Sequence, residues 1–503
     1  MYMKKIVPFI FLLVCTLSYG QITESKIKEF DAYVEKSRKL FQIPGLAVTV
    51  VKDGKVILKK GYGVRQLGLA QPVDAQTLFA CASTTKAMTA TCMAMLVDEG
   101  KVKWDDAVVN YLPDFQLYDP YVTRELKIRD LFTHNSGVGN ADFLWSFMDI
   151  PTEQVIEKMK LVEPSYSLRS SFIYQNIFYV VAGEVIEKVS GQPWYTFMQK
   201  RIFEPLQMTR TFPLLSQVND ANQSQPHFNY NNSIQVIQRT SADAVGAAGS
   251  VRSCVDDISK WAMCMLDSSK YAGDRLVKPG TWVELFKPQV IVPASQFYPT
   301  ANLTRPNWTT YSMGWFQQDY RGRKVNFHTG SLAGETAMHA QLPSERLAIY
   351  IFGNLDHAEV RHALLFKAFD HFALGGTRDW SKEINDLYEQ QAADIDQELK
   401  KFENERVANT KPSFDLAAYA GTYTDLLYGE LTITVQNNSL VFVTNNLVKA
   451  TLDHWHFDTF RGLYEELWWG NATATFTIGS NGKISSVNFE GMEFERKEAE
   501  PVK

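Results

Sequence analysis

Two residues that could break a bond together, Ser83 and Lys86, lie three positions apart at the start of an apolar stretch. Residues three apart in the first turn of a helix share a face, so the lysine amine can reach the serine hydroxyl. A serine hydroxyl becomes a good nucleophile when a neighbouring base takes its proton, and a lysine is such a base only if burial lowers its pKa. The amide of Ser83, at the helix start, would point at a developing oxyanion. The pattern predicts an acyl-transfer site.

The spacing alone does not decide between catalysis and an ordinary helix start. Two other S-x-x-K matches begin at Ser25 and Ser480, in polar segments where burial of the lysine is not expected. Between Ser83 and Asp98, by contrast, apolar residues occur nearly all round the predicted helix, which is typical of a helix that runs through a core. Burial of Lys86 is therefore the feature that separates this match from the other two.

Two further groups of residues could complete such a site. Tyr174 and Asn176 stand just before a predicted helix, where the tyrosine could carry a proton and the amide could hold a substrate carbonyl or the lysine. His328, Thr329 and Gly330 end a predicted strand, where the glycine would let a substrate backbone approach and the histidine could donate a hydrogen bond or relay a proton. A lone histidine at a strand end is more often structural, so the combination carries the prediction.

Together these residues resemble the superfamily of serine β-lactamases, D-alanyl-D-alanine carboxypeptidases and esterases, and they are most similar to its class C-like branch. Further segments that resemble landmarks of this family are residues 43–48, 52–54, 130–137, 204–208 and 311–315. The resemblance covers residues 22–374. It implies an α+β fold of the β-lactamase/transpeptidase type, with an antiparallel sheet flanked by helices and an all-helical region.

The resemblance also implies a role for each residue. Ser83 would be the nucleophile, Lys86 its proton acceptor and Tyr174 the group that protonates the leaving atom. The residues expected to contact the substrate are Asn176, His328, Thr329, Gly330 and Ser331. Ser331 would supply the second oxyanion amide. The implied reaction passes through an acyl-serine that water then cleaves, without a metal or an organic cofactor.

Three residues nearby bear on the details of the site. Many β-lactamases of this superfamily carry lysine where His328 stands, a permanent cation suited to a β-lactam carboxylate. A histidine with its ordinary pKa of about 6.5 would be mostly neutral at pH 7, which favours peptides or esters as natural substrates. If a protonated His328 did bind a carboxylate, activity on acidic substrates would fall above that pH. Gln175 is unusual but is expected to matter little, and His134 is expected to brace a loop.

Two classes of function stay open. The intact set favours an enzyme that cleaves an amide or ester bond in a small molecule or peptide, as a D-amino-acid peptidase, an esterase or a β-lactamase would. The alternative is a non-catalytic, penicillin-binding-like receptor that keeps the pocket without turnover. The chain has no G-x-S-x-G and no H-E-x-x-H, which argues against an α/β-hydrolase and a zinc hydrolase.

The first twenty residues predict export. Lys4 and Lys5 precede an apolar run and a small-residue cut site, so residues 1–20 read as a cleaved signal peptide. The run is shorter than the ~20 residues that a membrane span needs, so we expect a periplasmic or secreted protein with no stable membrane span after cleavage. With 45% hydrophobic and 21% charged residues and a net charge of -5, the chain is typical of soluble globular proteins. Nothing indicates a nucleic-acid partner, and the oligomeric state stays open.

Residues 21–378 form the predicted hydrolase domain, in which a sheet built from both of its ends flanks a helical core. Helices are predicted over residues 22–41, 83–98, 176–189 and 256–266, and strands over residues 46–51, 55–59, 324–328, 338–342 and 347–352. Four cysteines remain after signal cleavage, without metal-ligand spacing, and are expected to be free and buried: Cys81, Cys92, Cys254 and Cys264.

Two more parts follow this domain. Residues 379–412, charged and rich in glutamine, predict a helical linker. Residues 413–503 contain short alternating runs with turn signals, resemble a lipocalin-like domain of unknown function, and predict a small antiparallel barrel. His454 and His456 would share one face of a strand there, but with no third ligand in view we favour a structural role over a metal pair.

Overall fold

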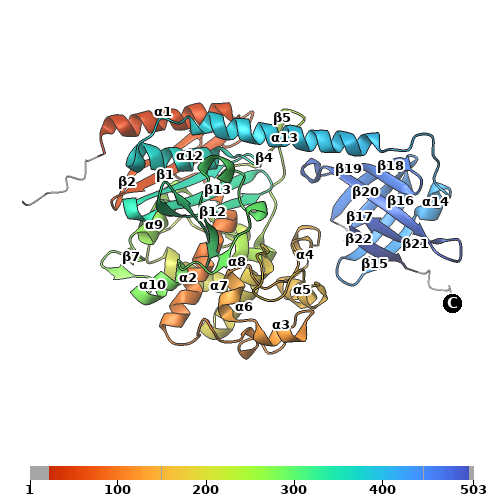
Figure 1. Cartoon of the computed structure of the whole chain (residues 1–503), viewed down its shortest axis with the longest axis horizontal. Coiled ribbons are helices and arrows are strands. Elements are labelled where there is room, and N and C mark those ends of the chain that lie inside the picture. Colours follow the sequence, from red (N-terminus) through yellow and green to blue (C-terminus); the bar gives the residue numbers. More distant parts are fainter. Residues whose placement is uncertain (1–21, 149, 446, 498–503) are drawn as a thin grey trace, which may run out of the picture.

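Two bodies and one long helix make up the part of the chain that the computed structural model describes, residues 22–148, 150–445 and 447–497 (Figure 1). The larger body is an α+β domain and the smaller one is a β-barrel, so the predicted fold class is confirmed. The helix that runs between them is α13 (Trp380–Asn404), which falls within the predicted linker. The predicted signal peptide, residues 1–20, lies outside the described residues.

An eight-stranded antiparallel sheet forms the centre of the larger body, in the order β2-β1-β14-β13-β12-β11-β10-β9. Its strands are β1 (Gly45–Lys52), β2 (Lys55–Gly63), β9 (Val290–Ile291), β10 (Thr309–Ser312), β11 (Trp315–Tyr320), β12 (Arg323–Leu332), β13 (Glu335–Leu342) and β14 (Leu347–Gly353). The predicted hairpin turn joins β1 to β2, where Asp53 and Gly54 have φ values of 50° and 76°. Strands from both ends of the domain therefore meet in one sheet, as predicted.

Helices cover both faces of this sheet, because alternate strand residues point to opposite sides. Val48 and Val50 of β1 share a buried cluster with Phe30 of α1 (Glu24–Leu40). Ala47, the residue before Val48, belongs instead to the large helical core on the other side. The helices that form these two layers are α1 and α12 (Val360–Phe369) on one face, and α2 (Thr85–Asp98), α6 (Ile177–Ser190) and α9 (Val255–Leu266) on the other.

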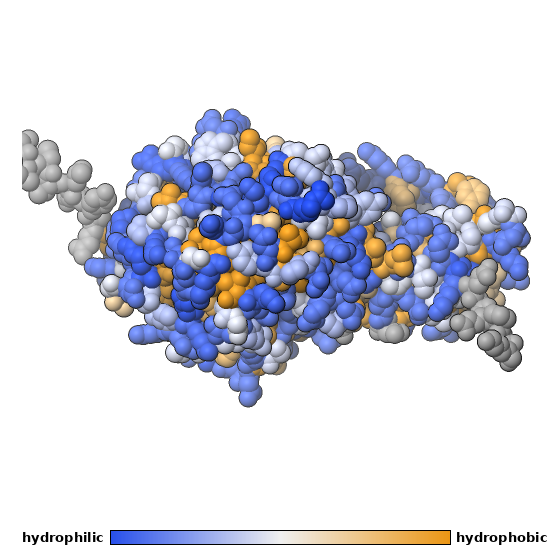
Figure 2. Space-filling view, turned by 90° about the horizontal axis from the view of Figure 1, so that it is seen from below, coloured by the Kyte–Doolittle hydropathy of each residue, from blue (hydrophilic) through white to orange (hydrophobic). Residues whose placement is uncertain are grey.

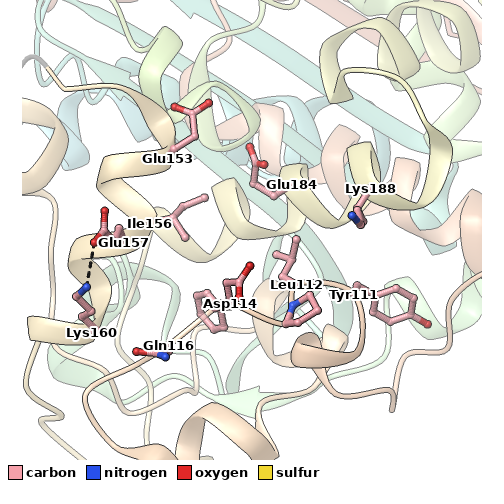
Figure 3. Close-up of a pocket in the computed structure, with 12 residues that line it drawn as sticks. Tyr111, Leu112, Asp114, Gln116, Glu153, Ile156, Glu157, Lys160, Glu184 and Lys188 are labelled. Atoms are coloured by element: carbon pink, nitrogen blue, oxygen red, sulfur yellow. Dashed lines mark hydrogen bonds and ion pairs between the residues drawn. The ribbon is translucent and has the colours of Figure 1, made fainter.

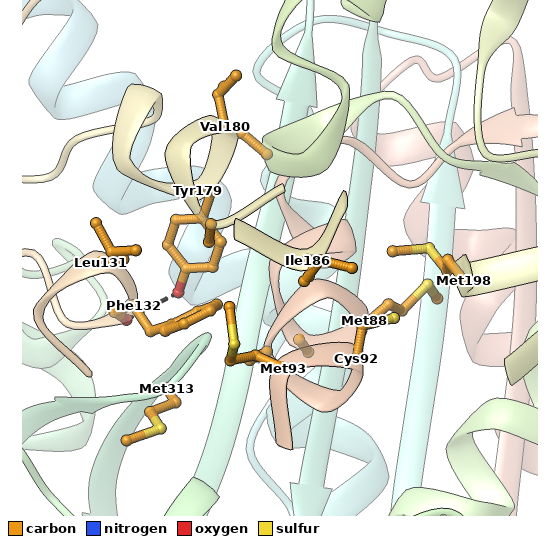
Figure 4. Close-up of a cluster of buried hydrophobic side chains, with 14 of the residues drawn as sticks. Met88, Cys92, Met93, Leu131, Phe132, Tyr179, Val180, Ile186, Met198 and Met313 are labelled. Carbon is orange, nitrogen blue, oxygen red and sulfur yellow. Dashed lines mark hydrogen bonds between the residues drawn. The ribbon is translucent and has the colours of Figure 1, made fainter. Parts of the chain in front are cut away.

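Helix α2 runs through the helical core instead of lying on its surface. Every residue from Thr85 to Leu96 is buried, which confirms the prediction made from its apolar circumference. Figure 4 shows Met88, Cys92 and Met93 of α2 among side chains of α6 and of the segment around Phe132. The hydroxyl of Tyr179 in α6 donates a hydrogen bond of 2.8 Å to the carbonyl of Phe132, which satisfies this buried hydroxyl.

Short elements fill the rest of the larger body. The two-stranded ladders are β3 (Phe79–Ala80) with β6 (Arg252–Ser253), β4 (His227–Tyr230) with β5 (Ser233–Val236), and β7 (Lys270–Tyr271) with β8 (Asp274–Arg275). The short helices are α3 (Pro120–Glu125), α4 (Phe143–Ser146), α5 (Thr152–Lys158), α7 (Trp194–Met198), α8 (Gly246–Gly249), α10 (Pro279–Leu285) and α11 (Ala301–Thr304). Strand β3 matters for the site, since it leads into Ser83.

The smaller body is a closed antiparallel barrel, so the prediction of a small barrel is confirmed. A short helix, α14 (Leu416–Tyr419), precedes its eight strands, β15 (Gly421–Asp425), β16 (Gly429–Gln436), β17 (Ser439–Thr444), β18 (Val448–His456), β19 (Thr459–Tyr464), β20 (Asn471–Ile478), β21 (Ile484–Phe489) and β22 (Met492–Arg496). Strand β15 pairs with β22 and closes the ring. Side chains such as Tyr423, Phe442 and Phe476 fill the interior as one buried cluster.

The structure corrects one boundary. His328, Thr329 and Gly330 do not end a strand but lie inside β12, which stays paired with β13 as far as Leu332. The first turn of α13, at the start of the predicted helical linker, packs into the larger body, since Trp380 is fully buried in its core and its Nε1 donates to Asp370 at 2.8 Å. The four cysteines are free and buried, as predicted.

Figure 2 shows hydrophilic residues over most of one face of both bodies, with apolar residues between them. None of the helices in the described part of the chain is long and apolar enough to cross a membrane. His454 Nε2 lies 2.9 Å from the Phe457 carbonyl and His456 Nδ1 accepts from the Val407 amide, and the described residues contain no group of three or more His, Cys, Asp or Glu that could hold a metal ion.

Candidate active site

The structure brings the predicted nucleophile and its lysine together beside β12. Ser83 lies in a short 3-10 turn (Ala82–Thr84) between β3 and α2, and its hydroxyl is 3.1 Å from Lys86 Nζ. Ala82, the residue before the serine, has a φ of 47°, a left-handed value that residues other than glycine rarely adopt. Such strain persists only where the surroundings hold it, and it turns the chain sharply just before Ser83.

Lys86 is fully buried, and its amine has three hydrogen-bond partners. Besides Ser83 Oγ, it donates to Asn176 Oδ1 at 2.6 Å and to the carbonyl of Ala248 at 3.0 Å. A neutral amine has two N–H groups and one lone pair. With both N–H groups given to Asn176 and Ala248, the lone pair faces Ser83, so this arrangement can accept the serine proton.

Burial also brings the lysine to the protonation state that a base needs. Desolvation lowers the pKa of Lys86 from 10.5 to about 7, and the charge of Asp142 opposes this by favouring the ammonium form. A substantial fraction of the lysine is therefore neutral at neutral pH. A general base is most effective when its pKa lies near the working pH.

Tyr174 lies against Lys86 in a proton-donating state. Its ring centroid is 4.9 Å from Lys86 Nζ, and its ring packs on His134 with centroids 4.2 Å apart. Burial raises the pKa of Tyr174 well above its usual value, an effect that the nearby Ser83 hydroxyl partly offsets. The tyrosine thus keeps its proton at neutral pH, which suits a group that protonates a leaving atom.

The structure buries His328 within β12, beside the site. Only 1% of the residue is exposed; Nδ1 lies 2.6 Å from the carbonyl of Thr329 and Nε2 lies 2.9 Å from the Tyr311 hydroxyl. Desolvation, helped by the charge of Lys86, lowers the pKa of His328 to about 3. The histidine is neutral at every physiological pH, and both its nitrogens are occupied, so a protonated His328 that binds a carboxylate does not fit this geometry.

The rest of this motif packs against the serine turn. A Cβ on Gly330 would lie 2.3 Å from the Cys81 carbonyl oxygen, so glycine is needed for β12 to approach that turn, a different reason from the predicted one. Thr329 Oγ1 lies 2.6 Å from the Tyr298 hydroxyl. Arg361 donates to the Gly330 carbonyl at 2.7 Å and to Ser331 Oγ at 2.9 Å, and Ser331 is the exposed member. The motif therefore forms the wall beside Ser83.

Comparison with known sequences decides the family. The sequence model described as Beta-lactamase matches residues 30–370. The chain belongs to the Beta-lactamase family. A second match, to a domain of unknown function named DUF3471, covers residues 405–501, which include the barrel.

Relatives of this Beta-lactamase family member include hydrolases. It is 26% identical over 438 residues to the unguisins hydrolase ungD of Aspergillus violaceofuscus, which covers 81% of this chain and 76% of that protein. The fold is similar to that of the octameric penicillin-binding protein homologue from Pyrococcus abyssi, with a TM-score of 0.62, 19% identity, and 93% and 99% of the two chains covered. It is also similar to the D-amino acid amidase from Ochrobactrum anthropi SV3, with a TM-score of 0.58, 19% identity, and 68% and 98% covered.

Two residues to which the sequence analysis gave no role connect this family site to its surroundings. Asp142, in no recognised motif, accepts two hydrogen bonds from Asn176 Nδ2, at 2.9 and 3.1 Å. Gln175, which was expected to matter little, is fully buried and donates to the Gly139 carbonyl at 2.7 Å. For Gln175 the only signal was its position between two motif residues. Nothing in the sequence marks Asp142. His134 Nδ1 accepts a hydrogen bond of 3.0 Å from the backbone N–H of Gln175 and so braces this segment, as predicted.

The larger body also has an open hollow of about 660 Å³ away from Ser83 (Figure 3). Glu153, Glu157, Lys160 and Glu184 are among its lining residues, and Lys160 pairs with Glu157 at 2.9 Å. Burial, with the charges of Glu187 and Glu153, raises the pKa of Glu184 to about 7. None of the sequence-predicted site residues lines this hollow.

Proposed function

We propose that this chain is an exported serine hydrolase that cleaves an amide or ester bond through an acyl-serine intermediate. The observation that carries the proposal is the buried Lys86 amine, which shares its hydrogen bonds between Ser83, Asn176 and Ala248. A lysine held this way, with a pKa of about 7, can serve as a base at neutral pH.

The proposed reaction runs in two halves. Ser83 Oγ attacks the substrate carbonyl carbon while its proton passes to Lys86, and the C–N or C–O bond of the tetrahedral intermediate then breaks. The leaving atom takes the hydroxyl proton of Tyr174, which Lys86 replaces. In the second half a water molecule gives one proton to the same pair of groups and bonds through its oxygen to the acyl carbon. The bond from that carbon to Ser83 Oγ then breaks and Oγ takes the proton back, which releases the acid and restores the serine.

Peptides or amides that contain a D-residue are the first substrates to test. The solved neighbours include a D-amino acid amidase and a D-stereospecific amidohydrolase, and a relative is named for hydrolysis of unguisins. The neutral, buried His328 supports this choice, because it offers no cation for the carboxylate of a β-lactam. We propose ester hydrolysis as a side activity of the same machinery.

The deciding experiment is intact-mass labelling of the mature protein with a fluorophosphonate and, separately, with a penicillin. We expect a single adduct that is lost in Ser83→Ala and kept in Ser480→Ala, which removes the serine of another S-x-x-K match on an exposed turn of the barrel. Turnover is then compared on a D-alanyl dipeptide, its L-enantiomer, a small ester and a chromogenic cephalosporin. Absence of an adduct from both probes would replace the enzyme by the non-catalytic receptor.

Export is tested on the same material. If residues 1–20 are a signal peptide, the protein recovered from the cell envelope or the medium begins at Gln21. Intact mass of that protein reads the cut site directly, and a chain that keeps Met1 to Gly20 would contradict the proposal.

A further inference from the structure

Helix α4 lies between the candidate active site and the barrel, and it contacts both. On one side its first residue follows Asp142, which is hydrogen-bonded to Asn176. On the other side Phe143 and Phe147, one helical turn apart, pack into the hydrophobic cluster of the barrel. Leu144, on a different face, is buried in the helical core of the larger body. The helix is thus held from both bodies.

The contacts on the site side are numerous for so short a segment. Asp142 accepts hydrogen bonds from Asn176 Nδ2 and, at 3.0 Å, from Trp145 Nε1. Asn140 donates to the Tyr174 carbonyl at 3.4 Å, and Gln175 donates to the Gly139 carbonyl at 2.7 Å. Each residue from Tyr174 to Asn176 therefore meets the segment that leads into α4.

These contacts connect α4 to Lys86 through Asn176. Asn176 uses its amide nitrogen for Asp142 and its amide oxygen for Lys86 Nζ, so the carboxylate decides which way the amide faces. If the amide turned over, its N–H groups would face the lysine and its oxygen would face a carboxylate. Asp142 thus orients Asn176 and places a negative charge close behind the amine of Lys86.

The barrel contributes aromatic contacts to the other side of α4. The rings of Phe147 and Trp469 have centroids 4.4 Å apart, and those of Phe147 and Tyr464 are 6.2 Å apart. Phe143 meets Tyr428 edge to face at 6.3 Å. Phe147, although it belongs to the larger body, is only 4% exposed because the barrel covers it.

We propose that Asp142 is a positioning residue for Lys86, and that the C-terminal barrel keeps it in place by packing on α4. The barrel then serves the chemistry of a site that it does not itself line. This inference rests on the proposed function for its catalytic meaning, whereas the link from the barrel to Lys86 can be measured without turnover.

The first test changes Asp142 in the full-length protein. Asp142→Asn keeps an oxygen that can accept from Asn176 but removes the charge that favours protonated Lys86, so the titration of Lys86 shifts to lower pH. Asp142→Ala also frees the Asn176 amide, so the maximal rate of Ser83 labelling by a fluorophosphonate falls roughly tenfold or more. The titration is read by NMR of [ε-13C]lysine, with the resonance assigned by its loss in Lys86→Arg. A merely structural Asp142 would leave that titration unmoved.

The second test changes the barrel, with a matched control. Trp469→Ala removes the ring that contacts α4, and we expect a roughly three- to tenfold lower labelling rate. Trp455→Ala removes the other aromatic anchor of the barrel, which stacks on Phe402 of α13 with centroids 6.2 Å apart, and we expect a rate close to that of the wild type. Thermal unfolding checks both variants, and Phe143→Ala replaces Trp469→Ala if the latter does not fold.

The outcomes separate this inference from the proposed function. An unchanged Lys86 titration in Asp142→Asn, or equal labelling rates in Trp469→Ala and Trp455→Ala, would overturn the inference even if the wild type is labelled at Ser83. A wild type that is not labelled would overturn the proposed function, while a shifted titration in Asp142→Asn would still support the positioning role.

Discussion

Lys86 and Glu184 both have pKa values of about 7, but for opposite reasons. Lys86 belongs to α2 and lies beside the start of α6, whereas Glu184 stands in the middle of α6. Desolvation lowers the pKa of the lysine and raises that of the carboxyl. Lys86 is fully buried, and its amine has three hydrogen-bond partners, one of which is a serine hydroxyl. Glu184 faces an open hollow, and its shift comes from burial and from the like charges of Glu187 and Glu153.

The comparison shows that a shifted pKa does not by itself mark an active site. Burial of any charge shifts its pKa, and structural groups shift as catalytic ones do. The region of Lys86 adds a serine nucleophile at 3.1 Å, whereas the hollow around Glu184 has a proton-holding tyrosine, Tyr111, but no serine, threonine or cysteine among its lining residues. Geometry, not pKa, separates the two regions, and the following experiments test that separation.

The largest difference is expected on removal of the two groups themselves. Lys86→Met deletes the base, and the rate of Ser83 labelling should fall by roughly a thousandfold, in the range of general-base effects. Glu184→Gln should leave the rate unchanged, because its carboxyl touches nothing that reacts. Stopped-flow or quenched mass measurements at pH 8 read both variants. Equal losses in the two variants would mean that the Lys86 region is not special.

A glycine in the Lys86 region should tolerate change far less than one elsewhere. Gly330→Ala puts a methyl group 2.3 Å from the Cys81 carbonyl, so we expect a loss of about 1–3 kcal/mol of unfolding free energy together with slower labelling. Gly280 has no atom within 4 Å of the equivalent position, and Gly280→Ala should be neutral. Chemical denaturation and labelling rates, measured side by side, check this pair, and a wild-type-like Gly330→Ala would refute the packing argument.

The pH dependence of labelling should follow the lysine alone. The rate should rise roughly tenfold per pH unit below the Lys86 pKa of about 7 and then level off as the amine loses its proton. No decline from His328 is expected between pH 5 and 9, since its pKa is about 3. Glu184→Gln should give the same profile. A profile that moves with Glu184, or that falls above pH 6.5, would contradict this assignment.

The smallest effect is a change in stability at the hollow. A carboxyl whose pKa is raised on folding binds its proton more tightly in the folded state, so its contribution to stability is lost as pH rises from about 4.5 to about 7. Glu184→Gln should therefore be more stable than the wild type above pH 7, by at most about 1 kcal/mol because solvent screens the partly exposed group. Urea denaturation at pH 5 and pH 8 measures the difference, which should vanish at the lower pH.

Part of this site was predictable from order and spacing. Four motif residues lie at helix starts, which changes from polar to apolar residues predict: Ser83, Lys86, Tyr174 and Asn176. The structure brings all four together. The reason for glycine at position 330 was not predictable. A side chain there would collide with the carbonyl of Cys81, which lies far away in the chain.

The amino-acid sequence by itself determined the Beta-lactamase family, the α+β class, the closed barrel and the set of residues around Ser83. These follow from local signals, namely periodicity, turn residues and motif spacing, which a chain carries at short range. Only the tertiary structure decided that His328 is neutral and buried and that Asp142 faces Asn176. Desolvation and hydrogen-bond direction depend on atoms from segments far apart in the chain, so no local pattern of residues encodes them.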